Sequence, residues 1–295
     1  LTPEQLVDLA IEKKLTAIAI TDHDSVASIK PATKYAKDKG IEIVPGIELS
    51  CDDSVFDFDK IDVLGLCIDV ENKELNDLIA HINNVRENHK KLIIEKIKSF
   101  GYKIEYEDVK KTVEGTFGRP HIAKYLRNKY PKEFISVADV FDKLIGYGKK
   151  AFIRIKGRVS IKDGVKVIRN AGGLAILAHP GIYPKEKSVK LIDFFIDNGG
   201  NGIETYYPYY IVCPKFKIDE KGNEYMINFY KEIVKSKGIL ESGGNDYHDD
   251  ERPTMGIVKI PESVLSNLKS NLKWKEDGLC GLQDCMVVES LQLPK

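Results

Sequence analysis

Residues 16–24 read Thr-Ala-Ile-Ala-Ile-Thr-Asp-His-Asp, and this stretch decides how the rest of the chain is interpreted. Its first six residues are apolar or β-branched, which predicts a short buried strand over Thr16–Thr21. The strand ends directly in two carboxylates and an imidazole. A helical pattern follows over Ser28–Lys39, so the chain begins to alternate between strands and helices.

The same alternation continues along most of the sequence. Further strands are predicted over Ile41–Ser50, Ile61–Ile68, Leu174–Ala178, Gly202–Tyr207, Ile239–Ser242 and Gly256–Ile260. Helices are predicted before or between the later strands, over Gly164–Asn170, Leu191–Asn198 and Glu224–Ser236. Short, continuously apolar strands that alternate with helices favour a parallel sheet or a barrel.

One internal region has a different pattern. Apolar residues recur at helical spacing from Leu75 to Leu92, and more helices are predicted over His121–Asn128 and Val137–Leu144. We therefore expect an all-helical insertion at residues 72–155. It would interrupt a discontinuous α/β domain made of residues 1–71 and 156–295.

The first residues predict a helix. Thr2 can cap it, Pro3 suits its first position and Gln5 completes a capping box. A helix followed by the strand at Thr16–Thr21 resembles a strand–helix unit that lacks its first strand. We expect the native protein to have residues before Leu1.

Composition narrows the classes of function. The 295 residues include 45 Lys and Arg and 45 Asp and Glu, so the net charge is zero. A broad surface for nucleic acid normally carries excess positive charge, so we expect no duplex DNA as a partner. No apolar run approaches the ~20 residues that span a bilayer, and nothing resembles a signal peptide.

The cysteines indicate a compartment. They are odd in number, scattered and without a C-x-x-C pair: Cys51, Cys67, Cys213, Cys280 and Cys285. This usage favours unpaired thiols in a reducing cytoplasm.

Residues of metal-ligand type recur in or just after the predicted strands. They are His23, Glu48, Asp62, His179, Asp246 and His248. Catalytic groups of α/β barrels lie at the carboxyl ends of parallel strands. Carboxylates mixed with imidazoles, without cysteine, suit Zn²⁺, Mn²⁺ or Fe²⁺. Each residue alone has an ordinary explanation, such as a cap, a buried ion pair or a turn. Their recurrence favours a metal site.

Asp246 and His248 lie two residues apart. In an extended segment both side chains would point the same way and could bind one metal cluster.

A second candidate site lies in the helical region. Arg119 and His121 flank Pro120 at a predicted helix start, where backbone amides and the helix dipole favour a phosphate. The alternative is an ordinary helix-entry turn. His81 and His89, on the long helix, are interpreted as structural.

Taken in order, these motifs resemble those of the PHP (polymerase and histidinol phosphatase) family of metal-dependent phosphoesterases, in its branch with a helical insertion that acts on nucleotide phosphates. The matching segments are Thr21-Asp22-His23-Asp24, Gly46-Ile47-Glu48, Gly118-Arg119-Pro120-His121, Ala178-His179-Pro180 and Gly244-Asn245-Asp246-Tyr247-His248.

The chain departs from the family pattern in two places that matter. The H-x-H and S-D-G motifs that normally open the domain are absent, which agrees with the missing first strand. Asp62 stands where the family usually has His, in Asp62-Val63-Leu64-Gly65. An oxygen ligand in place of nitrogen favours harder ions such as Mn²⁺. Asn245 in place of Ser is a minor change.

The resemblance implies a distorted (β/α)₇ barrel that holds two or three divalent metal ions, Mn, Fe or Zn, with Glu48 as a bridging ligand. It implies hydrolysis of a phosphate monoester by a metal-activated hydroxide. The expected substrate is a small nucleotide such as a 3′,5′-bisphosphate, and Arg119 and His121 would hold a substrate phosphate.

Two other functions remain open at this point. One is a 5′–3′ exonuclease acting on short RNA. The other is a degenerate, non-catalytic binding or regulatory protein, because the metal cluster lacks the H-x-H motif and has Asp62 replaced.

Overall fold

The computed structural model describes residues 1–272 apart from 54, 59, 114–116 and 249–253. The chain divides into two compact units. One is an α/β unit of residues 1–49, 62–76 and 161 onward, and the other is a mainly helical unit of residues 50–61 and 77–160. Each unit is described by itself.

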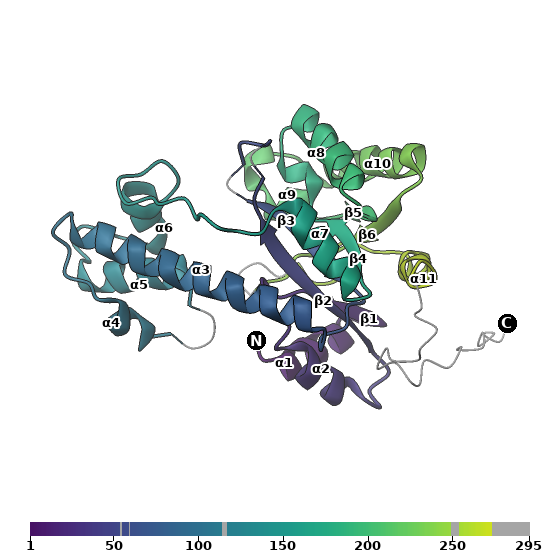
Figure 1. The fold of residues 1–295 in the computed structure, drawn as a ribbon, viewed down its shortest axis with the longest axis horizontal. Coiled ribbons are helices and arrows are strands. Elements are labelled where there is room, and N and C mark those ends of the chain that lie inside the picture. Colours follow the sequence, from purple (N-terminus) through teal and green to yellow (C-terminus); the bar gives the residue numbers. More distant parts are fainter. Residues whose placement is uncertain (54, 59, 114–116, 249–253, 273–295) are drawn as a thin grey trace. The chain divides into compact units, whose positions relative to one another are not determined.

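Six strands form one sheet within the described residues, in the order in which they occur along the chain (Figure 1). The strands are β1 (Ala17–Ile20), β2 (Glu42–Cys51), β3 (Ile61–Leu66), β4 (Leu174–Leu177), β5 (Gly202–Tyr206) and β6 (Leu240–Gly243). All six residues of β3 and all five of β5 are buried, as expected for strands covered on both faces.

The expectation of a uniformly parallel arrangement is wrong at one strand. β1 pairs with β2 in parallel, and β4, β5 and β6 also pair in parallel, but β3 is antiparallel to β4. A parallel neighbour needs a crossover of about a dozen residues or more. Only residues 52–60 separate β2 from β3, which is too short for a helical crossover.

Helices of the α/β unit separate most of the strands along the chain. They are α1 (Pro3–Glu12), α2 (Ile29–Ala36), α7 (Ile161–Asn170), α8 (Lys185–Asp197), α9 (Tyr209–Val212), α10 (Glu220–Lys237) and α11 (Glu262–Ser270), with short 3₁₀ turns at Pro180–Ile182 and Pro214–Phe216. The predicted capping box of α1 is present, since Gln5 N–H donates to Thr2 Oγ1 and Thr2 N–H donates to Gln5 Oε1.

Two apolar clusters hold the helices against the sheet. In the first, α1 and α2 pack beside the start of the sheet through Val7, Ala10 and Ala32. In the second, Val264 and Leu268 of α11 pack on residues of β3 and β4. Burial at roughly 25 cal/mol per Å² of apolar surface makes these contacts the main stabilisation of the unit.

The strand predicted over Gly256–Ile260 does not form. The side chain of Asn245 takes the place of a neighbouring strand there: its Oδ1 accepts the Val258 N–H at 2.7 Å and its Nδ2 donates to the Val258 carbonyl at 3.3 Å. The β-branched residues in this stretch suggested a strand, but one amide side chain satisfies the backbone groups of Val258.

The helical unit is built around α3 (Lys73–Lys98), whose first four residues belong to the α/β unit. It also contains α4 (Tyr106–Lys110), α5 (Arg119–Lys129), α6 (Val137–Val140) and a π-helical turn at Phe141–Ile145. Its core is apolar and separate, with Ile93, Ile97, Leu126, Phe134 and Leu144 fully buried or nearly so. This unit therefore has its own hydrophobic core.

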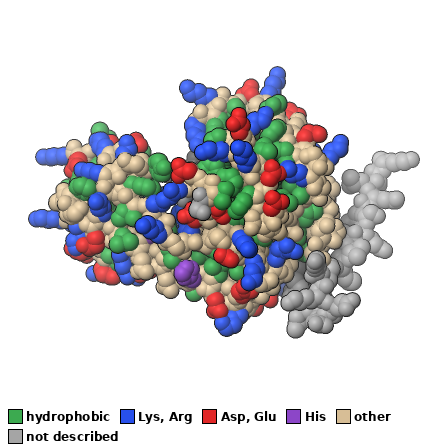
Figure 2. All heavy atoms as spheres, turned by 45° about the horizontal axis from the view of Figure 1, so that its top comes forward, with side chains coloured by type: hydrophobic (Ala, Val, Ile, Leu, Met, Phe, Trp, Pro, Cys, Tyr) green, Lys and Arg blue, Asp and Glu red, His purple; other side chains and the backbone are tan. Residues whose placement is uncertain are grey.

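The surface mixes both signs of charge. On the face in Figure 2, Lys and Arg side chains are interspersed with Asp and Glu, in keeping with the equal counts in the sequence. None of the helices in the described ranges has the length and apolar character needed to cross a membrane. Within the same ranges Cys51, Cys67 and Cys213 form no disulfide, while Cys280 and Cys285 lie outside the described residues.

Candidate metal centre

The first part of the site is a short extension of the β1–β2 ladder. His23 follows β1 and forms a parallel bridge with Glu48 of β2. The Asp24 N–H donates to the Glu48 carbonyl at 3.0 Å, and the Glu48 N–H donates to the Asp22 carbonyl at 3.2 Å. The motif that ends β1 is therefore held beside Glu48 by backbone hydrogen bonds.

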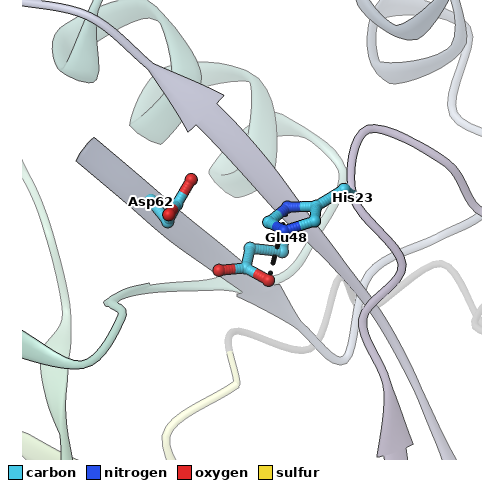
Figure 3. Close-up of side chains that lie close together, drawn as sticks. All are labelled: His23, Glu48 and Asp62. Atoms are coloured by element: carbon cyan, nitrogen blue, oxygen red, sulfur yellow. Dashed lines mark ion pairs between the residues drawn. The ribbon is translucent and has the colours of Figure 1, made fainter. Parts of the chain in front are cut away.

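His23, Glu48 and Asp62 form a compact group of three (Figure 3). One ligand-type atom of each lies within 4.8 Å of the others, a spacing that allows a single metal ion to be held. Asp62 is 0% exposed and Glu48 is 6% exposed. Buried carboxylates are costly unless they are paired or coordinate a cation.

Asp62 reaches this group because β3 runs against β4. It is the second residue of β3, so it lies at the start of its strand, and the Ala178 N–H donates to the Asp62 carbonyl at 3.1 Å. The start of an antiparallel strand meets the end of its neighbour, which places Asp62 beside His179. The candidate ligands were expected at strand ends, whereas Asp62 lies at the start of β3.

His179 joins the same group from the end of β4. Its Nε2 lies 3.2 Å from Glu48 Oε1 and 3.8 Å from Asp62 Oδ2. Burial lowers the pKa of His179, but the hydrogen bond to Glu48 and the nearby charges of Asp62, Glu48 and Glu204 outweigh it and raise the pKa to about 9.

Asp246 and His248 complete the set. His248 Nδ1 lies 3.3 Å from Asp246 Oδ1, and the rings of His248 and His23 are 6.0 Å apart. Asp246 has a φ of 46°, so the segment is not extended as the spacing argument assumed. The two side chains nevertheless contact each other. The other four predicted residues are joined by direct contacts, whereas Asp246 is linked to His179 through Tyr207 and His248 approaches the group beside the ring of His23.

The donor set suits a divalent cation. Nδ1 of His179 is buried and makes no hydrogen bond within the part of the chain that is described. A buried polar atom without a partner costs about 1–3 kcal/mol, so such atoms call for an explanation. Imidazole nitrogens and carboxylate oxygens facing one centre are the ligands that Mn²⁺, Fe²⁺ and Zn²⁺ accept.

Two further buried polar residues border the site and were missed from the sequence. Glu204 of β5 accepts the His179 N–H at 2.8 Å, and the Tyr207 hydroxyl donates to Asp246 Oδ2 at 2.5 Å. Burial and the charges of Asp246 and Glu48 raise the pKa of Glu204 to about 8, and burial raises the pKa of Tyr207. The sequence did contain a pattern that points to Glu204. The tripeptide Gly202-Ile203-Glu204 repeats Gly46-Ile47-Glu48 in another apolar strand.

Arg119 and His121 lie in the helical unit, in the first turn of α5. The Gly118 N–H donates to His121 Nδ1 at 3.1 Å, which caps the helix and agrees with the helix-entry alternative. Because Nδ1 is the acceptor, a neutral His121 carries its proton on Nε2 and can still donate there. Binding of phosphate by these residues stays a prediction. His89 is buried, and its Nε2 is 2.7 Å from the Ile153 carbonyl, as a structural role requires.

An α/β sheet that presents imidazoles and carboxylates to one buried centre is the arrangement of a metal-dependent hydrolase. The comparisons with known proteins agree with this class. The family model described as "PHP domain" matches residues 1–168. The chain belongs to the PHP domain family. The class predicted from the motifs, a metal-dependent phosphoesterase of that family, is confirmed.

Individual relatives differ in activity. The chain is 31% identical to the 5′-3′ exoribonuclease Rnm of Salmonella typhimurium over 210 residues. This matched region covers 70% of each of the two proteins. It is 25% identical to the 3′,5′-nucleoside bisphosphate phosphatase of Chromobacterium violaceum, over 84% of this chain and 82% of the relative. A solved protein of Bifidobacterium adolescentis, assigned to the metal-dependent phosphoesterases, shares the fold with a TM-score of 0.73 at 23% identity, over 91% and 90% of the two chains.

Proposed function

We propose that this protein hydrolyses a phosphate monoester of a small nucleotide, with 3′,5′-nucleoside bisphosphates as the substrate class. The observation that carries the proposal is the group of His23, Glu48 and Asp62, whose ligand-type atoms lie within 4.8 Å of one another, with His179 Nε2 3.2 Å from Glu48 Oε1. The similarity to a 3′,5′-nucleoside bisphosphate phosphatase over most of both chains supports the substrate class.

The proposed ligands are the six residues of this centre: His23, Glu48, Asp62, His179, Asp246 and His248. Two or three divalent ions are proposed, with Mn²⁺ favoured over Zn²⁺ because Asp62 supplies a hard oxygen. When bound, such ions polarise the phosphoryl oxygens and lower the pKa of water to near neutrality.

The protein's own side chains orient the site. Glu48 has one oxygen 3.4 Å from His23 and the other 3.2 Å from His179, so its carboxylate suits a bridging position. The buried surroundings of Glu48 and Asp62 strengthen the attraction of their carboxylates for a divalent cation, because the effective dielectric constant is lower than in water.

Arg119 and His121 are proposed to hold the second, non-reacting phosphate. Arg119 offers a planar fork of N–H donors that matches a phosphate, and it stays charged at all working pH values. The Nε2–H of His121 would add a further donor, since its Nδ1 already accepts the Gly118 N–H. Such a clamp fixes the ester relative to the reacting groups.

The finer architecture is also a proposal. We infer that the six-stranded sheet is part of a distorted (β/α)₇ barrel, and that residues 72–155 are an insertion into it. The family match and the likeness to a solved phosphoesterase over 91% of the chain support the barrel. The separate apolar core of the helical unit supports the insertion.

A 5′–3′ exoribonuclease acting on short RNA is the second candidate. The higher identity favours it, since the Rnm relative is 31% identical and the bisphosphate phosphatase is 25% identical. Both reactions would use the same metal centre, and they differ in whether the chain releases inorganic phosphate or successive nucleotides.

The test is a substrate screen on protein whose metal content has been measured. Purified protein loaded with Mn²⁺ is given nucleoside mono- and bisphosphates and a short 5′-phosphorylated RNA. Release of phosphate from bisphosphates in preference to monophosphates supports the proposal. Stepwise shortening of the RNA without phosphate release selects the exonuclease. If the protein binds metal but turns over none of these substrates, it is a non-catalytic binding protein and the proposed function is wrong.

A further inference from the structure

Strand β5 supplies none of the six proposed ligands, yet it lies between the two strands that carry three of them. β4 on one side ends at His179, and β6 on the other side leads to Asp246 and His248. Two buried polar side chains, Glu204 in β5 and Tyr207 just after it, face these neighbours. The Glu204 carboxyl group accepts a hydrogen bond from His179 on the β4 side, and the Tyr207 hydroxyl donates one to Asp246 on the β6 side.

A register irregularity allows both side chains to face the centre. In a regular strand Glu204 and Tyr206 would share a face and Tyr207 would lie on the other. The β5–β6 pairing shifts between Glu204 and Tyr206, and Tyr206 packs in the apolar cluster with Ile176 instead. Irregularities of this kind re-aim side chains next to functional sites.

On the β4 side, Glu204 stabilises an unfavourable backbone. His179 has φ 29° and ψ 57°, in the left-handed region that residues with a Cβ rarely adopt. Its N–H points to Glu204 Oε2 at 2.8 Å, a buried hydrogen bond to a carboxyl group. A strained conformation persists only where its surroundings determine it, and Glu204 is the partner that does so here.

The Glu204 carboxyl group also lies close to Gly244, the residue that follows β6. A Cβ placed on Gly244 would collide with Glu204 Oε1, so the absence of a side chain at Gly244 makes room for the carboxyl group. The Glu204 side chain therefore fills the space between the ends of β4 and β6.

On the β6 side, Tyr207 contacts the side chain of Asp246. Its hydroxyl donates to Asp246 Oδ2 at 2.5 Å, and its ring lies 5.4 Å from the ring of His179. Asp246 also has a left-handed backbone, with φ 46°. Tyr207 is 1% exposed, so the hydrogen bond is shielded from water.

We propose that Glu204 and Tyr207 are positioning residues: Glu204 holds the backbone of His179 and Tyr207 holds the carboxylate of Asp246, so that both side chains are aligned for a metal ion before it binds. This inference rests on the proposed function for its metal, and it adds two residues outside the ligand set. Partners that orient ligands in this way typically affect metal affinity by about 10–100-fold.

The test compares four variants of the whole chain. Glu204→Met removes the acceptor at similar size, whereas Glu204→Gln keeps an acceptor oxygen. Tyr207→Phe removes only the hydroxyl. Tyr230→Phe is the matched control, because it removes another buried tyrosine hydroxyl, whose partner is Ser188 Oγ at 3.0 Å rather than a proposed ligand.

The first readout is the dissociation constant for Mn²⁺ alone, measured by titration calorimetry. Glu204→Met and Tyr207→Phe are expected to weaken binding by about 10–100-fold, while Glu204→Gln and Tyr230→Phe stay close to wild type. Wild-type affinity in both Glu204→Met and Tyr207→Phe would overturn the inference. So would an equal loss in Tyr230→Phe, because the effect would then be one of general stability.

The second readout needs no metal. Amide hydrogen exchange of the His179 N–H in metal-free protein should be about tenfold faster in Glu204→Met and unchanged in Tyr230→Phe. If wild-type protein bound no Mn²⁺, the proposed function would fail while this measurement still decided the role of Glu204.

If Glu204→Met does not fold, Gly244→Ala replaces it, because the added Cβ displaces the carboxyl group without removing it. Unchanged exchange at His179 in that variant would overturn the inference for Glu204.

Discussion

Glu48 Oε1 lies 3.2 Å from His179 Nε2, although 131 residues separate the two in the chain. The other oxygen of Glu48 lies 3.4 Å from His23 Nδ1. One carboxylate therefore connects the end of β1 with the end of β4 across β2 and β3. Removing its charge should disturb the whole centre rather than a single contact.

Glu48→Gln keeps the size of the side chain and removes its charge. We expect Mn²⁺ affinity to fall by more than about 100-fold, beyond the range seen for residues that only orient ligands. The metal content of purified protein, measured by mass spectrometry, checks this. Glu42→Gln is the matched control, because it makes the same change in the same strand at a residue paired with Lys269. Equal metal content in both variants would contradict the assignment.

The stability of the metal-free protein should fall as the pH rises from about 6.5 to 9. The folded state raises the pKa of His179 from 6.5 to about 9, so its contribution is complete below pH 6.5 and is lost as the pH passes 9. Glu204 acts in the same direction, because the folded state raises its pKa from 4.5 to about 8 and favours its neutral form. The shift of His179 alone corresponds to a change on the order of 3 kcal/mol.

Thermal unfolding in the presence of a chelator, at several pH values across this window, measures the effect. His179→Asn removes the imidazole and should make the profile shallower between pH 6.5 and 9, leaving the contribution of Glu204 up to about pH 8. A wild-type unfolding temperature that rises over this window would show that the contacts of His179 with Glu48 and Asp62 do not stabilise its charged form.

Asp62 should set the choice of metal. Asp62→His restores the nitrogen donor that the family motif usually has, so the ratio of Zn²⁺ to Mn²⁺ affinity should rise by about tenfold. Competition titrations with the two ions give this ratio directly. Asp197→His, the same change on the exposed surface of α8, should leave it as in wild type. An unchanged ratio of Zn²⁺ to Mn²⁺ affinity in Asp62→His would show that Asp62 is not a metal ligand.

Arg119→Ala should impair a bisphosphate substrate much more than a simple aryl phosphate. If the guanidinium holds the non-reacting phosphate, its loss misplaces the ester and costs on the order of 10²-fold in kcat/KM on the bisphosphate only. Metal content should not change. Arg127→Ala, further along α5, is the control, because that side chain donates to Asn128 on the same helix.

The pattern of losses identifies the role of Arg119. Equal losses on both substrates would place it at the reacting phosphate. No loss on either would make it a structural residue of the helix entry, as the capping contact of His121 suggests for that turn.

Much of the fold followed from local patterns. The capping box at Thr2 and Gln5 located α1, and the apolar run before His23 located β1. These patterns are readable because a cap and a buried strand depend on residues a few positions apart. The candidate ligands were also found from sequence, since each interrupts or directly follows an apolar run.

Two errors had the same origin. The direction of β3 and the failed strand at Gly256–Ile260 depended on partners distant in the chain. Propensity favours an extended backbone in both segments, but it does not specify which neighbour a strand pairs with or in which direction.

The sequence by itself determined most of the helices and strands, the family motifs and the candidate metal ligands. Only the tertiary structure decided that Asp62 reaches the site from a strand start, and that Glu204 and Tyr207 hold His179 and Asp246. The physical reason is that local sequence governs backbone conformation over a few residues. The meeting of side chains from distant segments depends on strand order, strand direction and packing, which the whole chain sets together.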